Sequence, residues 1–395
     1  MEVKAVFMKC SSKIHFKDSK NMEDVPSESI DLIVTSPPYP MIEMWDEIFS
    51  KQNKKIKKAL DREDGSLAFE LMHKELDLVW DEVFRVLKRG GIACINIGDA
   101  TRTISKHFAL YTNHSRIQTY MQKIGFSALP AILWRKQTNA PNKFMGSGMM
   151  PPGAYVTLEH EYVLILRKGN KKEFKTEAEK KQRRESSFFW EERNVWFSDV
   201  WTDLKGTSQN LFDNKVRGRS AAYPFELPYR LIAMFSVKGD NVLDPFLGIG
   251  TTIYSAMAAG RNSIGYEIDS NLRDIIVSRL DGIVEYANKR IIERLENHCT
   301  FVENQFEKKG KFKYFNKNYL FPVTTSQEIA LLINELQSVN KTEEDRFEVI
   351  YSNNPQKDFI RDWDNFVMSD SEKKELKKPV SQKRNKKAKQ QQLFN

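Results

Sequence analysis

The residues most suited to chemistry form a short segment near the N-terminus, Thr35-Ser36-Pro37-Pro38-Tyr39, which follows the apolar run 30–34. The two prolines fix two φ angles and remove two backbone donors, and each favours extended geometry in the residue before it. We therefore expect a stiff loop at a strand end, with outward carbonyls, the hydroxyl of Ser36 and the ring of Tyr39. Such a loop is suited to holding a flat ring that carries an amino group.

A second segment, Asp244-Pro245-Phe246-Leu247-Gly248-Ile249-Gly250-Thr251-Thr252, has the composition of a nucleotide-binding loop. It follows a short apolar strand, and Gly248 and Gly250 permit tight turns and a close approach of the backbone to a ligand. Thr251 and Thr252 are expected to cap the helix that follows.

The surroundings of this loop have the order of a Rossmann unit: a strand, a glycine-containing loop, a helix and a second strand that ends in an acid. The second strand is expected over 263–266, and the acid is Glu267, which would bond ribose hydroxyls. The third glycine of the dinucleotide fingerprint is absent, since Tyr254 or Ser255 stands in its place, and no phosphate-loop motif occurs. A cofactor with a ribose and without a phosphate fits better, and S-adenosylmethionine is such a cofactor.

The elements that must position these loops are predicted by apolar periodicity. Short apolar runs alternate with stretches of helical spacing, which predicts an α/β fold with a Rossmann-like, doubly wound and mostly parallel sheet. Strands are expected over 30–34, 92–97, 129–134, 161–166, 241–243 and 263–266. Helices are expected over 72–88, 115–124, 228–236, 251–259 and 271–295, with Gly90-Gly91 ending the first.

Three stretches interrupt this alternation: the lysine-rich residues 47–66, the Gly-, Pro- and Met-rich residues 136–158, and 168–222, where a mixed-charge run precedes aromatics and arginines. We expect them to be insertions on a compact core, where loops carry function. After about residue 296 the alternation fades, so 296–368 could form an appendage, and 369–395 are expected to be disordered.

Composition limits the class of protein. The chain has 395 residues, 40% of them hydrophobic, and no apolar run approaches a membrane span or a signal peptide. Its three separated cysteines, Cys10, Cys94 and Cys299, argue against a disulfide framework or a zinc site and fit a reducing cytosol. The net charge is +9, of which 371–395 carry +7. This tail could attract nucleic acid, and a solvated end is the other interpretation.

Both loops resemble motifs of one family. DPFLGIGTT at 244–252 resembles motif I of the S-adenosylmethionine-dependent DNA amino-methyltransferases, and TSPPYP at 35–40 resembles their catalytic motif IV. Residues 222–228 resemble the family's lead-in to the cofactor strand, and 132–136 and His160-Glu161-Tyr162 match further segments. The catalytic motif precedes the cofactor motif, which is the circularly permuted order of the beta class.

The resemblance implies a methyltransferase catalytic domain over 1–295, with both motifs at the C-terminal edge of one sheet. It implies a catalytic set made of Ser36, Pro37, Pro38 and Tyr39. It implies that the cofactor S-adenosyl-L-methionine is bound by Asp18, Asp244, Phe246, Gly248, Gly250, Thr251, Thr252 and Glu267. Asp18 would contact the adenine, although Lys17 stands before it where the family has glycine.

The chemistry implied is methyl transfer to an exocyclic amino group of a DNA base. The lone pair of this nitrogen is delocalised into the ring, and acceptors such as the Pro37 carbonyl and the Ser36 hydroxyl would favour its localisation. Positioning and electrostatics carry such a step, with no need for a metal or a covalent intermediate. The base must leave the duplex, and Tyr39 would stack on it.

Ser36, the first residue of the catalytic set, indicates which base is methylated. Family members with Ser mostly methylate cytosine N4, and those with Asp or Asn mostly adenine N6, so Ser36 favours N4-cytosine with N6-adenine as the alternative. Methylation of cytosine C5 needs a cysteine, usually after proline, and none of the three follows proline. A catalytically inactive DNA-binding module and a nicotinamide-dependent oxidoreductase are alternatives of other classes.

The expected partner is double-stranded DNA, with sequence recognition from 136–222. The candidate DNA contacts are Lys51, Lys54, Lys55, Arg217 and Arg219, although lysines 51–58 could equally be a solvated helix face. Trp196 and Trp201 could touch DNA or pack in the core. We expect a monomer or homodimer in the cytoplasm of a prokaryote, associated with the nucleoid. It would serve a restriction–modification system beside a cognate restriction endonuclease, without a stable complex.

Overall fold

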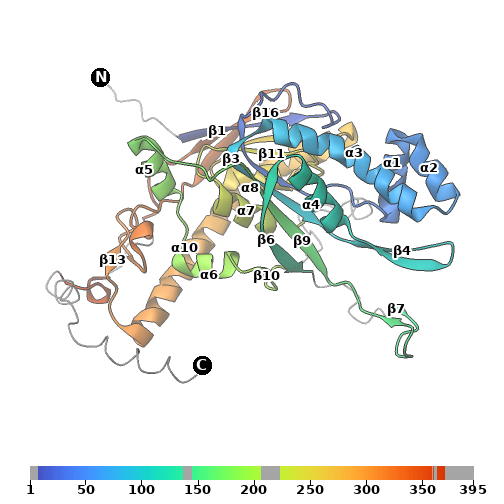
Figure 1. Ribbon diagram of the computed structural model, residues 1–395. Coiled ribbons are helices and arrows are strands. Elements are labelled where there is room, and N and C mark those ends of the chain that lie inside the picture. The colour runs from blue at the N-terminus through green and yellow to red at the C-terminus, as the bar shows by residue number, and fades with distance from the viewer. Residues whose placement is uncertain (1–7, 137–144, 206–222, 358, 360–362, 370–395) are drawn as a thin grey trace.

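The computed structural model describes residues 8–136, 145–205, 223–357, 359 and 363–369. Most of these residues form an α/β assembly around one large sheet (Figure 1). The predicted contacts Arg217 and Arg219 and almost all of the basic tail 369–395 lie outside the described residues.

The main sheet has ten strands. In spatial order they are β10 (Val200–Trp201), β6 (Phe126–Arg135), β9 (His160–Lys168), β3 (Leu87–Ile97), β2 (Ile30–Thr35), β11 (Asn241–Asp244), β12 (Asn262–Tyr266), β1 (Met8–His15), β16 (Arg346–Tyr351) and β15 (Leu336–Glu343). The five central strands from β3 to β1 are parallel, whereas β9 and β16 run antiparallel to their neighbours. The predicted mostly parallel α/β sheet is therefore confirmed.

Helices cover both faces of this sheet (Figure 1). The described α-helices are α1 (Asp46–Gln52), α2 (Lys54–Asp61), α3 (Gly65–Val86), α4 (Asn113–Lys123), α5 (Glu177–Glu185), α6 (Trp190–Trp196), α7 (Glu226–Phe235), α8 (Thr251–Ala258), α9 (Arg273–Ser278) and α10 (Ile283–Lys309). Side chains of β2 alternate between the two layers: Ile33 packs with the α3 side, and Leu32 and Val34 pack with the α7 side. All six residues of β2 are buried, as expected for a central parallel strand between helices.

The predicted helix 72–88 is longer at its start and ends earlier than expected. Asp64 caps α3 by accepting from the Leu67 amide at 3.0 Å, and the helix runs to Val86, where β3 follows at once. Gly90-Gly91 therefore lies inside a strand and does not end the helix. Gly90 has φ +88°, and a Cβ there would lie 2.8 Å from the Lys172 backbone nitrogen, so close chain approach explains the glycine.

The described residues after 295 join the core. The boundary predicted at residue 295 falls inside α10, and the predicted helix 271–295 is divided into α9, a 3-10 turn and the start of α10. Within 296–368, β16 pairs with β1 from Met8↔Tyr351 to Lys13↔Arg346, and β15 pairs with β16. A small pair, β13 (Tyr314–Phe315) and β14 (Pro322–Val323), lies outside the main sheet. The described part of 296–368 thus extends the central sheet.

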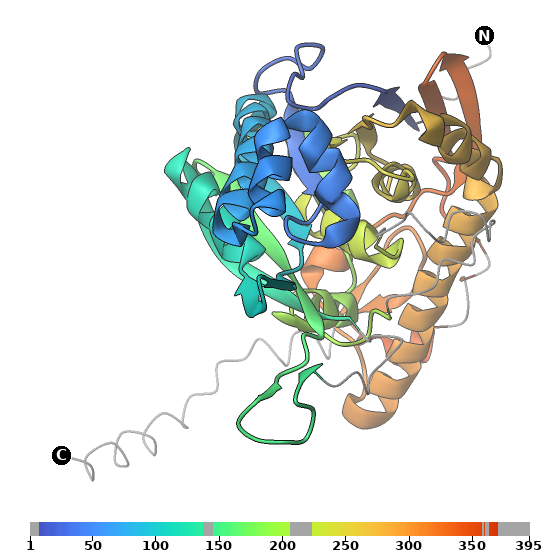
Figure 2. The same cartoon turned by 90° about the vertical axis from the view of Figure 1, so that its right-hand side faces the viewer.

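Two hairpins project from the core at the end that also carries α1 and α2 (Figures 1 and 2). One is β4 (Ala100–Ile104) with β5 (His107–Tyr111), and the other is β7 (Met145–Gly146) with β8 (Ala154–Tyr155). Among the described residues, no helix is long and apolar enough to cross a membrane.

Candidate active site

The two predicted loops meet at one edge of the sheet. Strands β2 and β11 are parallel neighbours, with Leu32 opposite Val242 and Ile33 opposite Leu243. At their ends the Thr35 hydroxyl donates to the Asp244 carboxylate at 2.5 Å, although the two residues are 209 positions apart. The segments that follow, 36–39 and 245–252, therefore start side by side.

Asp244 organises the glycine-containing loop. Its carboxylate also accepts from Thr252 Oγ1 at 2.5 Å, from Tyr223 OH at 3.3 Å and from the Phe246 amide at 3.0 Å. Burial raises the pKa of Asp244, while hydrogen bonds from the two threonines oppose the rise. These hydrogen bonds fix the start of the glycine-containing loop against the end of β2 and the start of α8.

The two glycines of the loop have different local environments. Gly250 has φ +89°, and a Cβ there would lie 2.8 Å from Tyr254 OH. Gly248 has φ +56°, and a Cβ there would meet nothing within 4 Å. Gly250 also occupies the N-cap position of α8, where no side chain makes a capping bond. The expectation that Thr251 and Thr252 cap this helix is therefore wrong: Thr252 instead bonds Asp244.

Glu267 follows the end of β12, and Asp18 follows the end of β1, the next two strands of the sheet after β11. Glu267 accepts from the Gly248 amide at 2.7 Å and from the Asp269 amide at 2.8 Å, and burial raises its pKa to about 7. A carboxylate has about four acceptor positions, so it can still accept from a ligand. Asp18 lies beyond β1, accepts from the Lys20 amide at 3.0 Å and has a side chain that is 43% exposed.

Phe246 lies on the other side of the loop, where its ring packs edge-on against Trp80 with 5.8 Å between the centroids. It is partly buried against the α3 layer. The positions predicted to hold the cofactor thus follow the ends of β11, β12 and β1, and a Cβ at Gly248 would meet nothing within 4 Å.

The predicted catalytic loop, residues 35–39, contains a hydrogen-bond network centred on the Tyr39 phenol. Tyr39 OH donates to Glu161 Oε2 at 3.0 Å, and Asn96 Nδ2 donates to Tyr39 OH at 2.9 Å and to Glu161 Oε2 at 2.7 Å. Ser36 Oγ lies 3.1 Å from Tyr39 OH. Burial, followed by the charge of Glu161, raises the pKa of Tyr39 well above its ordinary value. The phenol therefore stays protonated and oriented.

The strands beside the loop supply this network. Lys136 Nζ donates to Glu161 Oε1 at 2.9 Å. The Tyr39 ring packs against Gly98, where a Cβ would lie 2.9 Å from the ring. Sequence reasoning assigned no role to Asn96, Glu161 or Lys136. The available signals were a polar residue inside the apolar run 92–97 and an acid at the start of the run after His160.

The candidate DNA contacts are partly described. Lys51 is exposed and pairs with Glu47 at 2.6 Å, and Lys54 and Lys55 are exposed at the start of α2. Both tryptophans are buried, and Trp201 Nε1 donates to the Trp196 carbonyl at 3.1 Å, so they pack in the core.

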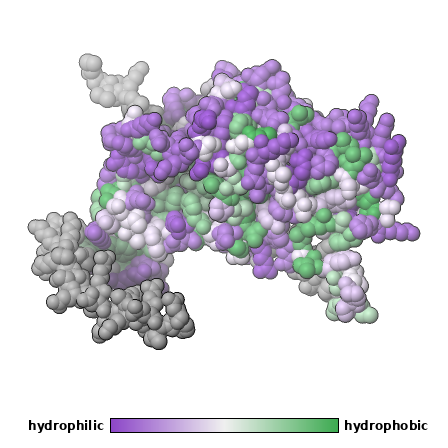
Figure 3. Space-filling view, in the orientation of Figure 1, coloured by the Kyte–Doolittle hydropathy of each residue, from purple (hydrophilic) through white to green (hydrophobic). Residues whose placement is uncertain are grey.

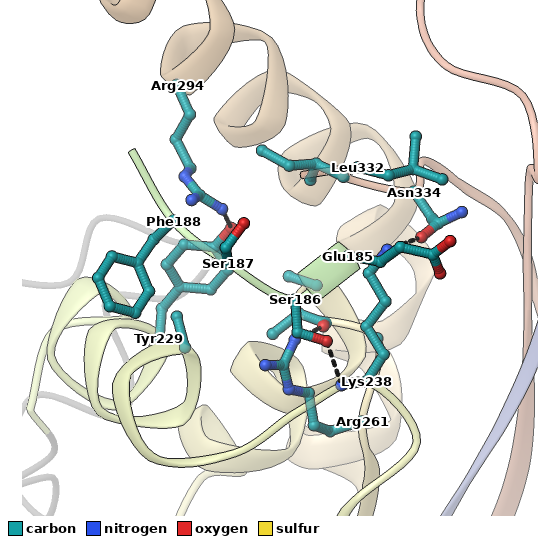
Figure 4. Close-up of a pocket in the computed structure, with 15 residues that line it drawn as sticks. Glu185, Ser186, Ser187, Phe188, Tyr229, Lys238, Arg261, Arg294, Leu332 and Asn334 are labelled. Atoms are coloured by element: carbon teal, nitrogen blue, oxygen red, sulfur yellow. Dashed lines mark hydrogen bonds between the residues drawn. The ribbon is translucent and has the colours of Figure 1, made fainter. Parts of the chain in front are cut away.

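A small cavity lies at the opposite edge of the sheet (Figure 4). Two of its lining residues, Lys238 and Arg261, precede β11 and β12, whereas the predicted cofactor residues follow these strands. Lys238 Nζ donates to Asn334 Oδ1 at 2.5 Å, and burial lowers the pKa of this lysine to about 7. Arg294 donates to Tyr229 OH at 2.9 Å. The cavity is thus distinct from the edge where the two loops meet.

Known proteins share this arrangement. Residues 30–278 match the family model for N6/N4 methyltransferases, described as DNA methylase, and this range contains both loops. The chain is 53% identical to the type II methyltransferase M.MthZI of Methanothermobacter thermautotrophicus, over 89% of this chain and 98% of that protein. It is 50% identical to the type II methyltransferase M.MjaI of Methanocaldococcus jannaschii, over 68% of this chain and 90% of that protein.

A solved structure has the same fold. It is a protein of Thermus thermophilus assigned as a DNA modification methylase and complexed with S-adenosyl-L-methionine. It has 31% identity and a TM-score of 0.51, over 67% of this chain and 93% of that chain. The open space at Gly248 and the acceptor capacity of Glu267 fit this cofactor. S-adenosyl-L-methionine is the cofactor of this protein, and the chain belongs to the N6/N4 DNA methylase family.

Proposed function

We propose that this DNA methyltransferase methylates the exocyclic N4 of a cytosine that has been flipped out of duplex DNA. The observation that carries the proposal is the hydroxyl of Ser36 at the first position of the catalytic loop, 3.1 Å from Tyr39 OH. A hydroxyl can donate and accept at once. It can therefore donate to cytosine N3 while it accepts a hydrogen from N4.

The network around Tyr39 fixes Ser36 as a donor. Tyr39 OH donates its proton to Glu161, so in the contact between Ser36 Oγ and Tyr39 OH the serine hydroxyl donates, and it would turn from the phenol to cytosine N3 when the base binds. The Pro37 carbonyl would accept the other amino hydrogen, and the ring of Tyr39 would stack on the base. These contacts favour a nitrogen with a localised lone pair, aligned for attack.

The cofactor supplies an electrophilic methyl group on a sulfonium, and the protein's part is to hold donor and acceptor in line. We assign the backbone of Gly248 and the carboxylates of Glu267 and Asp18 to cofactor binding, because they follow the ends of adjacent strands, Glu267 accepts from the Gly248 amide and a Cβ at Gly248 would meet nothing within 4 Å. Asp244 and Thr252 would act indirectly by fixing the loop. The catalytic loop precedes the cofactor loop along the chain, which supports the permuted order of the beta class.

The runner-up is methylation of adenine N6. Adenine presents the same pair of groups, an acceptor at N1 beside the amino group, and the matched family covers N6 and N4 enzymes. The names of the type II relatives support a place in a restriction–modification system, beside a restriction endonuclease that recognises the same site. We propose a cytoplasmic prokaryotic enzyme for this role.

The test is mass spectrometry of nucleosides from mixed-sequence DNA incubated with the enzyme and methyl-labelled S-adenosyl-L-methionine. Labelled N4-methylcytosine is the expected product. Labelled N6-methyladenine would replace the proposal by the runner-up, and unlabelled DNA would refute both. Sequencing of the methylated positions then gives the target site, which the experiments below require.

A further inference from the structure

The β7–β8 hairpin carries the most exposed large apolar side chains among the described residues. Val156 is 93% exposed, Met149 is 84% exposed and Met150 is 71% exposed. Isolated exposed apolar residues are ordinary, but a cluster on a projecting element points to an interaction site. Figure 3 shows this projecting hairpin without the strong purple that marks much of the same face.

The tip of this hairpin is a defined turn. The Ser147 amide donates to the Gly153 carbonyl at 2.9 Å, and the Ser147 hydroxyl donates to the Met150 carbonyl. Gly146 has φ +66°, and a Cβ there would lie 2.2 Å from the Gly153 carbonyl oxygen, so only glycine closes the turn. Met149 and Met150 therefore lie in a turn with a fixed backbone, so less conformational entropy is lost when their side chains are buried against a partner.

The base of the hairpin is tied to the catalytic loop. The chain leaves β6 at Lys136, whose amide donates to the Glu159 carbonyl at 2.9 Å and whose ammonium pairs with Glu161. Glu161 in turn holds Tyr39. The Tyr155 ring also stacks on Phe108 of β5, with 4.6 Å between the centroids. The hairpin thus projects from the site where we place the flipped base.

The surroundings identify the partner as nucleic acid. Figure 2 looks onto the end of the molecule where α1 and α2 lie above the projecting hairpin. The exposed face of α2 carries Lys54, Lys55, Lys57 and Lys58, none of which makes an ion pair with another described residue. Unpaired lysines suit the phosphate backbone. An apolar tip that projects from the same end of the molecule suits the bases, since proteins insert Met, Leu, Phe or Pro between base steps to unstack them.

We propose that the β7–β8 hairpin inserts Met149 and Met150 into the base stack of duplex DNA beside the flipped base. Their thioether side chains adapt to irregular apolar surfaces, so they can fill the space that the base leaves. This inference rests on the proposed function in one respect, because it requires the enzyme to act on duplex DNA by flipping a base. The new element is the assignment of Met149 and Met150 as the side chains that occupy the place of the flipped base in the stack.

The test compares the double variant Met149→Ala/Met150→Ala with the control Ile292→Ala, an exposed apolar residue of α10. The probe is a duplex with the mapped target site and 2-aminopurine next to the target base. We expect about tenfold weaker binding for the double variant, loss of most of the 2-aminopurine fluorescence increase, and an unchanged slope of log Kd against log salt. Lysine-to-alanine variants at 54 and 55 should instead reduce that slope.

The hairpin proposal is overturned if the double variant binds with the wild-type Kd and fluorescence increase. It is also overturned if that variant loses self-association in sedimentation while DNA binding is unchanged, since the tip would then bind a second copy. Failure of the proposed function looks different, because the wild-type protein itself would give no fluorescence increase or would methylate another base.

Discussion

Replacing Glu161 by glutamine should slow methyl transfer without weakening cofactor binding, because this carboxylate fixes the phenol of Tyr39. Its Oε2 atom accepts from Tyr39 OH at 3.0 Å and from Asn96 Nδ2 at 2.7 Å, in a side chain that is 12% exposed. A hydrogen bond to a charged group contributes about 1.5–3 kcal/mol, and about 1.4 kcal/mol is a tenfold change in rate. We therefore expect the single-turnover rate to fall roughly 10- to 100-fold.

The assay is a double-mutant cycle with Tyr39→Phe, which removes the hydrogen bond and keeps the ring. Because Glu161→Gln removes the charge that strengthens this bond, and Tyr39→Phe removes the bond itself, the double variant should be no slower than the slower single variant, with a coupling energy of about 1.5 kcal/mol or more. Glu159→Gln is the matched control, since this carboxylate is two residues away and pairs at 3.2 Å with the exposed Arg135.

Two results would refute the role assigned to the hydrogen bond between Tyr39 and Glu161. If the effects of the two substitutions multiply, the bond between Tyr39 and Glu161 is not what controls the rate. If Glu161→Gln raises the Kd for S-adenosyl-L-methionine as much as it lowers the rate, the substitution acts on the cofactor loop and not only on the phenol. Isothermal titration calorimetry measures that Kd.

Three further predictions concern the cofactor loop. Asp244→Asn should lower the free energy of unfolding, measured with urea, by about 1–3 kcal/mol, because an amide oxygen cannot replace a carboxylate that accepts from three hydroxyls and an amide; unchanged stability would contradict this. Gly250→Ala should lower the free energy of unfolding by about 1 kcal/mol or more, since its Cβ would lie 2.8 Å from Tyr254 OH. Gly248→Ala, whose Cβ would meet nothing within 4 Å, should mainly weaken cofactor binding. Equal Kd values for S-adenosyl-L-methionine in the two variants would contradict this difference. The pKa of Glu267 is raised from 4.5 to about 7, so protonated Glu267 contributes fully to the free energy of unfolding below about pH 4.5, and this contribution is lost as pH rises through about 7. Glu267→Gln should not show this loss. If the free energy of unfolding of the variant falls with pH in parallel with wild type, the prediction is refuted.

The elements around both loops could be predicted because their signals are local. Buried parallel strands have continuous apolar runs, and proline and glycine mark the loops that follow, so the strands that became β2, β11 and β12 stood out. The nearness of Thr35 to Asp244 is not a local signal. Only the order of strands in the sheet brings the two residues together, and the family resemblance supplied that order in advance.

The elements that sequence reasoning missed depend on distant pairing. Strand β1 has a polar sequence, and its Ser12 is buried because its hydroxyl accepts from Ser263 at 2.7 Å, 251 residues away. The partnership of Asn96 with Glu161 depends on the antiparallel register of β3 and β9, where Asn96 lies opposite Val163. A periodicity argument sees a single strand at a time, so neither contact could be expected from it.

The proposed role of Ser36 in directing methyl transfer to cytosine N4 can be tested by measuring the yield of N4-methylcytosine from wild-type enzyme and Ser36→Ala on the mapped duplex. We predict N4-methylcytosine as the wild-type product, and a fall of about tenfold or more in its rate of formation for Ser36→Ala, with the same Kd for S-adenosyl-L-methionine. An N6-methyladenine product, or a Ser36→Ala variant as fast as wild type, would show that Ser36 does not direct the methyl group to cytosine N4.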